Sequence, residues 1–268
     1  MPEAARLLPE YETPPVIEVV CGIQFVPINT LTIAHLGRWW SRVANDFPTC
    51  REVPPLIPII ERFDVEQGPA LDEIGPLPLP RLWLINGKGD QLVQLQKDRF
   101  LFNWRKISEE HIYPRYSFVR SSFDRYREDF VAFLQETTQQ NLNPIQYELT
   151  YINHIPEGPH SWLKPTDIGK ILPEVIWQPK QGRFLPEPER IEFQADFILP
   201  NRVGRLHVRA RNVRRKSDNL GVILLEITAR GFGGEIDKWF GLAHEWIVQG
   251  FTDLTDTNAQ KELWRRVQ

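Results

Sequence analysis

The chain has 268 residues, of which 41% are hydrophobic and 25% charged, a globular composition that argues against wholesale disorder. Its 32 Lys and Arg against 35 Asp and Glu give a net charge of −3, without the overall basic charge of a dedicated nucleic-acid domain. No stretch approaches the ~20 consecutive apolar residues of a membrane span, and the acidic, proline-containing start does not resemble a signal peptide. We therefore expect a cytoplasmic protein with no membrane association.

Metal and thiol chemistry have little support in the sequence. Cys21 and Cys50 are the only cysteines, too few for a disulfide framework or a four-thiolate zinc site. The six histidines form no two-histidine pair at helical spacing, and His244-Glu245 begins like a zinc-protease motif that Val248 breaks. We therefore predict no metal and no cofactor.

Nucleotide and acyl-transfer motifs are also missing. The chain has no Gly-x-Ser-x-Gly elbow and no phosphate-binding Walker loop. The glycines at 231, 233 and 234 lie between a strand and a helix, but Ile236 occupies the third glycine position of the dinucleotide pattern. Glu235 and Asp237 would also repel a phosphate from the start of that helix. These glycines favour a tight structural turn.

The first half predicts strands that alternate with two amphipathic helices. In chain order the segments are a strand over 16–25, a helix over 30–47 capped by Thr30 or Thr32, a hairpin over 81–96, an extended stretch over 98–106, a helix after Pro114 and a strand over 145–155. The Asn86-Gly87 pair predicts the hairpin turn, with both residues at positive φ. Residues 48–80, with eight prolines, predict a long irregular connection with one short edge strand over 59–63.

The second half repeats this rhythm. After a proline-broken stretch with a short helix near residue 166 come strands over 190–200, 202–213 and 221–231, then helices over 235–254 and 258–267. Segregated strands and helices joined by hairpins favour an α+β fold. We expect largely antiparallel sheet of about six to eight strands packed by two long amphipathic helices. The two halves, over 14–156 and 157–268, could be similar α+β units or one continuous domain.

One strand carries the most polarised pattern of the chain. Because side chains alternate across a strand, Arg205, His207, Arg209 and Arg211 share one face, opposite Leu206, Val208 and Ala210. We call these four residues the basic row; Arg105 and Arg230 are expected neighbours. The row could hold an acidic partner or track phosphates. Alternatively, Glu192, Asp196 and Glu226 on adjacent strands would neutralise much of it.

Three functions remain compatible with these residues. The leading hypothesis is a non-enzymatic binding or regulatory protein that engages a macromolecular partner through the basic row. A second hypothesis is nucleic-acid binding by the same row, and a third is a small hydrolase-like enzyme, or an inactive relative, that gathers several of His154, His160, Asp196 and Glu226. A homo-oligomer built through an exposed apolar face is compatible with each.

Several short motifs resemble a family of sporadically distributed, uncharacterised bacterial and archaeal proteins of about this length. They are PPVIEVV and GIQF from Pro14 to Phe25, FNWR from Phe102, Tyr113-Pro114, YINHI from Tyr151, and AHEWIVQGFTDLT from Ala243, followed by Trp264. Their order and spacing carry the resemblance over nearly the whole chain. The resemblance implies no activity, cofactor or catalytic residue, and the sporadic distribution suggests an accessory role in a mobile or defence-related gene cluster.

Overall fold

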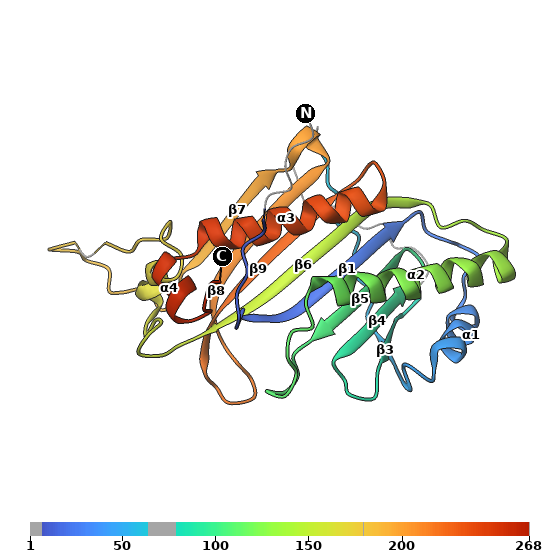
Figure 1. Cartoon of the computed structure of the whole chain (residues 1–268), viewed down its shortest axis with the longest axis horizontal. Helices are drawn as coiled ribbons and strands as arrows, with labels where there is room; N and C mark the ends of the chain where they lie inside the picture. Colours follow the sequence, from blue (N-terminus) through green and yellow to red (C-terminus); the bar gives the residue numbers. More distant parts are fainter. Residues whose placement is uncertain (1–6, 64–78, 179, 268) are drawn as a thin grey trace. The chain divides into compact units, whose positions relative to one another are not determined.

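The computed structural model describes residues 7–63, 79–178 and 180–267 (Figure 1). They form two compact units that are each discontinuous in sequence. Unit 1 comprises Met1–Ile17, Thr150–Ala229 and Phe240–Gln268, and unit 2 comprises Glu18–Leu149 and Arg230–Trp239. The strands are β1 (Val16–Phe25), β2 (Thr49–Val53), β3 (Arg81–Ile85), β4 (Gln91–Gln96), β5 (Arg99–Arg105), β6 (Pro144–Pro156), β7 (Glu192–Ile198), β8 (Gly204–Arg214) and β9 (Gly221–Gly231). The helices are α1 (Ile33–Val43), α2 (Tyr116–Thr138), α3 (Ile236–Leu254) and α4 (Thr257–Glu262), with short 3-10 helices η1 (Pro165–Lys170) and η2 (Pro200–Arg202).

Unit 2 contains the strand order β2-β3-β4-β5-β1-β6, in which β6 contributes its first half. The registered pairs β2–β3, β3–β4, β4–β5 and β5–β1 are all antiparallel. Hairpins explain this order, because β3, β4 and β5 follow one another along the chain through short turns. The register places alternate residues of each strand on a common face, so each face has its own composition.

Aromatic side chains form the core of unit 2 on one face of its sheet. Phe130 of α2 packs against Phe25 of β1, Trp39 of α1 and Phe100 of β5, with ring centroids 6.4, 5.3 and 5.7 Å away. The predicted stripe of α2 is buried throughout, at Val119, Phe123, Tyr126, Phe130, Phe133 and Leu134. Thr32 is the N-cap of α1, and its backbone N–H donates to Nδ1 of His35 at 3.2 Å.

Unit 1 contains the second half of β6 followed by β9, β8 and β7. Helix α3 packs on these strands, and the Cβ that Gly250 lacks would lie 3.1 Å from Leu206 of β8. The ring of His244 in α3 lies 6.2 Å from that of Tyr151 in β6. The alternating Leu206, Val208 and Ala210 are buried. The opposite side chains of β8 therefore point away from α3.

The structure confirms the α+β class and corrects its details. The described residues form nine strands, more than the expected six to eight, because the proline-rich connection contains β2. The four α-helices have 11, 23, 19 and 6 residues, so they are not simply two long ones. The two halves over 14–156 and 157–268 stay a prediction.

Two local expectations in unit 2 are wrong. Residues 59–63 form no strand, and the N–H of Glu61 and the carbonyl of Ile59 bond to the side chain of Gln146 instead of to a neighbouring strand. The hairpin turn after β3 does not have positive φ at Asn86 and Gly87. Gly89 instead adopts φ 78°, and its N–H donates to the carbonyl of Asn86 at 3.0 Å. A type I turn that ends in a left-handed glycine joins the strands equally well.

Candidate functional site

The basic row lies on the face of β8 opposite α3. In register with β7, Arg211 is opposite Glu192, Arg209 is opposite Gln194, and His207 is opposite Asp196. Nδ1 of His207 lies 2.8 Å from Oδ1 of Asp196, so this acid pairs across the strands with the histidine of the row. The acids on β7 therefore balance part of the row.

The last two arginines of the row, Arg209 and Arg211, differ from its other members. Arg209 and Arg211 are exposed, and neither has a hydrogen-bond or ion-pair partner among the residues that the structure describes. In the turn that follows, Arg214 donates to the carbonyl of Asn219, and Arg215 pairs with Asp218. Unlike Arg214 and Arg215, which bond within the turn, Arg209 and Arg211 are exposed cations of β8 without a side-chain partner among the described residues.

The two expected neighbours of the row belong to unit 2, whereas the row belongs to unit 1. Arg230 of β9 donates through Nε to Glu148 of β6 at 2.6 Å. Arg105 of β5 donates to the carbonyl of Gly89 at 3.0 Å and lies over the ring of Trp83. Both guanidinium groups therefore already have partners inside unit 2.

A second polar feature, which the sequence did not indicate, crosses unit 2. Gln96 of β4 is opposite Arg99 of β5, and Arg99 is opposite Gln24 of β1. Gln24 and Arg99 line a small cavity together with Gln146 of β6. We call Gln96, Arg99, Gln24 and Gln146 the polar row. None of the four is more than 8% exposed, although they occupy the sheet face opposite the aromatic core.

Residues 54–61, which we call the strap, are bound to both ends of the polar row. At one end, Gln96 accepts from the backbone N–H of Leu56 at 3.0 Å and donates to its carbonyl at 3.2 Å. At the other end, Gln146 accepts from the N–H of Glu61 at 2.8 Å and donates to the carbonyl of Ile59 at 2.6 Å. The strap thus spans the strands from β4 to β6.

Arg99 is the charged residue at the centre of the polar row. It donates through one terminal nitrogen to Gln24 at 3.0 Å, while its buried Nε has no hydrogen-bond partner in the structure. Burial lowers the pKa of this guanidinium, against the opposing effect of Glu148 and Asp98. The adjoining cavity is small, at about 10 Å³.

The residues of the enzyme hypothesis come together only in part. A cavity of about 350 Å³ in unit 1 is lined by His154, His160 and Ser161, among others. Burial and the nearby Arg215 lower the pKa of His154, so its imidazole is neutral at pH 7. Asp196 instead pairs with His207, and Glu226 does not line this cavity.

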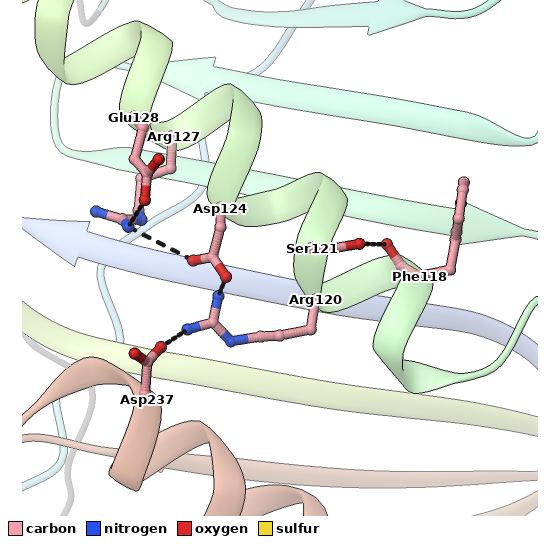
Figure 2. A network of polar contacts seen from close by, with 7 residues as sticks. All are labelled: Phe118, Arg120, Ser121, Asp124, Arg127, Glu128 and Asp237. Atoms are coloured by element: carbon pink, nitrogen blue, oxygen red, sulfur yellow. Dashed lines mark hydrogen bonds and ion pairs between the residues drawn. The ribbon is translucent and has the colours of Figure 1, made fainter.

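A third charged group connects α2 with the first turn of α3 within unit 2. Figure 2 shows Arg120 between Asp124 and Asp237, with Arg127 next to Asp124 and Glu128. The N–O distance from Arg120 to Asp237 is 2.6 Å. Three acids surround two cations, so the group is locally neutralised and does not offer a cationic binding surface.

No cluster of three or more His, Cys, Asp or Glu side chains within the described residues could hold a metal ion. No helix in the described part of the chain combines the length and apolar character needed to cross a bilayer. Compared with protein-family models, curated proteins and solved structures, the chain matches none of them. The family resemblance therefore stays a prediction, and the function is argued from geometry.

Proposed function

We propose that the chain is a non-enzymatic binding protein whose basic row docks an acidic segment of a protein partner. The observation that carries this proposal is the pair Arg209 and Arg211, exposed on one strand face without a partner among the described residues. Alternate residues of a strand lie about 6.6 to 6.8 Å apart. That spacing suits two carboxylates on alternate residues of an extended acidic segment.

The charges around the row favour a protein over a nucleic acid. Glu192 and Asp196 are interleaved with the arginines across β7, and Asp196 pairs with His207. A phosphate backbone is uniformly negative, so these acids would repel part of it. A protein segment can place neutral or basic residues opposite the acids, which makes the mixed surface a more selective partner for it.

The test is affinity capture from the native host with the wild type and two charge-matched variants. Arg209→Glu/Arg211→Glu reverses the two accessible charges of the row. Arg38→Glu/Arg51→Glu makes the same change in net charge at two exposed arginines of unit 2 that have no partner among the described residues. We expect a defined protein to be captured by the wild type and the control but lost by the row variant.

Nuclease treatment and reconstitution decide between the partners. The captured protein, once purified, should bind the wild type directly after nuclease treatment, and its affinity should fall at least about tenfold for the row variant. Capture that nuclease abolishes would favour nucleic-acid binding instead. Equal binding by both folded variants would refute the role of the row. The identity of the partner would also test the predicted accessory role in a mobile or defence-related gene cluster.

A further inference from the structure

The polar row of unit 2 recognises a peptide main chain. We propose that the strap is an intramolecular ligand and that the polar row is a receptor site for extended, proline-containing peptides. In this proposal, a similar segment of another protein displaces the strap and binds in its place. This site is separate from the basic row and does not depend on the proposed function.

All four glutamine contacts to the strap involve its backbone. Gln96 binds the N–H and carbonyl of Leu56, and Gln146 binds the N–H of Glu61 and the carbonyl of Ile59. An amide side chain that pairs with a main chain in this way reproduces the contacts of a neighbouring strand. Prolines occupy positions 54, 55 and 58, and none falls at the two positions whose N–H groups donate. These four hydrogen bonds therefore require backbone N–H groups at two positions of the peptide and place no requirement on its side chains.

The length of the strap matches the width of the site. From β4 to β6 is three strand spacings, or about 14 Å at 4.7–4.9 Å each. Five steps from Leu56 to Glu61 cover about 15 Å in the polyproline II conformation, at about 3.1 Å per residue. Only an extended segment reaches both glutamines, and prolines favour this conformation before binding.

Most of the apolar side chains of the strap contribute little to holding it in place. Ile57, Ile59 and Ile60 are each at least 40% exposed. Glu61 is the exception, because it is only 3% exposed. A competing peptide therefore needs an extended backbone and a polar residue equivalent to Glu61, while its other side chains are free to vary.

When the strap leaves, hydration of the polar row compensates for the hydrogen bonds that are lost. Arg99 lies in the polar row between the glutamines that bind the strap, and its buried Nε has no hydrogen-bond partner. When the strap leaves, water can reach the guanidinium and the glutamine amides. The open state is therefore an accessible alternative, and the strap competes with other peptides instead of being a permanent part of the core.

The first experiment supplies the strap as a separate molecule. In the receptor variant, residues 54–61 of the full chain are replaced by eight Gly and Ser residues. The probe is a fluorescein-labelled peptide with the sequence of residues 53–62, measured by fluorescence anisotropy. We expect the receptor variant to bind it at least about tenfold more tightly than the wild type, whose own strap competes.

Two controls test recognition of the main chain. Gln96→Ala/Gln146→Ala in the receptor variant should weaken binding at least about tenfold, because all four backbone contacts are lost. A probe with N-methyl groups at the positions of Leu56 and Glu61 should bind as weakly, since it keeps every side chain but lacks both donors. A folded receptor variant that does not bind the probe, or binds both probes equally, would overturn the proposal.

Hydrogen exchange gives a test that uses the wild-type protein alone and needs no variant. The amides of Leu56 and Glu61 should exchange faster than those of β4 and β5, and millimolar unlabelled probe should accelerate them further by keeping the strap displaced. If these two amides exchange only with the strands, with or without peptide, the strap is a fixed part of the fold and the proposal is wrong.

Discussion

The two polar sheet faces of this protein both arise from the alternation of side chains along strands, but one face is buried and the other is exposed. In unit 2, Gln96, Arg99 and Gln146 are buried, and the two glutamines bind the backbone of a segment distant in sequence. In unit 1, Arg209 and Arg211 of the basic row are exposed. Each set comes from strands whose other face is apolar. Alternation therefore defines which side chains share a face, but not whether that face meets solvent.

The energetic meaning of a polar side chain differs between the two faces. A buried amide or guanidinium must find partners inside the protein, so its removal leaves other groups unsatisfied. An exposed arginine is hydrated, and its removal costs the fold little. Removal of a polar-row side chain is therefore expected to destabilise the fold, whereas removal of an exposed arginine of the basic row is not, although both rows contain arginine.

The largest difference between buried and exposed positions is expected in the labelling rates of the two thiols. Cys21 of β1 is fully buried, and burial raises its pKa, whereas Cys50 of the edge strand β2 is partly exposed. Under native conditions a thiol reagent should modify Cys50 at least about 10³-fold faster than Cys21, which reacts only after opening of the structure. Mass spectrometry of labelled peptides measures both rates.

Labelling in denaturant provides the control for this contrast, because both thiols should then react at similar rates. Burial also raises the pKa of Cys50, so its native labelling should accelerate as the pH rises above neutrality. Comparable native rates for the two thiols would show that β1 is far more accessible than its complete burial indicates.

The second contrast compares two arginines on polar faces. Arg99→Ala removes the donor to Gln24 and the buried positive charge nearest to Asp98 and Glu148, of which only Glu148 also pairs with Arg230. We expect the free energy of unfolding to fall by about 3 kcal/mol. Arg209→Ala should change it by no more than about 0.5 kcal/mol. Urea unfolding of both variants measures the difference, and equal effects would remove the distinction between the two faces.

Much of the fold follows from local patterns in the sequence. The four- and three-residue spacing of Val119, Phe123 and Tyr126 predicts the buried stripe of α2, and alternation predicts the common face of the basic row. These patterns suffice because helix and strand geometry repeat over neighbouring residues. The exposed state of Arg209 is compatible with the same pattern but is not required by it.

The polar row could not be predicted in this way. Gln96 binds a residue 40 positions earlier, and Gln146 binds one 85 positions earlier. In the sequence, both look like the solvent-facing positions of alternating strands. The prolines of the strap indicate an irregular connection, but they do not show where it docks. Only the tertiary structure brings the donors of Leu56 and Glu61 to these amides.

In unit 1, the buried His244 predicts that the stability of the fold depends on pH. Burial of His244, a residue of α3, lowers its pKa to about 4, below its ordinary value of 6.5. The folded state therefore favours the neutral ring, and stability falls as the pH drops from about 6.5 towards 4 because the unfolded state binds a proton first. Between pH 7 and pH 4.5 the loss should be about 2.5 kcal/mol.

Comparison with His244→Gln isolates this contribution from other titrating groups. The variant lacks the imidazole, so the difference in unfolding free energy between wild type and variant should become less favourable to the wild type on acidification. Urea unfolding at the two pH values measures it. Parallel loss of stability in both proteins would mean that His244 is protonated as easily in the folded state as in the unfolded state.

A small effect on stability is also expected for the cross-strand pair on the exposed face of β8. His207 and Asp196 form a cross-strand pair at 2.8 Å, with Asp196 43% exposed at its side chain. Because solvent screens such a pair, His207→Gln should lower the free energy of unfolding by less than about 1 kcal/mol. Raising the salt to 1 M shortens the Debye length to about 3 Å and should reduce the difference further. A loss as large as that for Arg99→Ala would show that the face of β8 is held together by its polar contacts and would remove the distinction between the exposed basic row and the buried polar row.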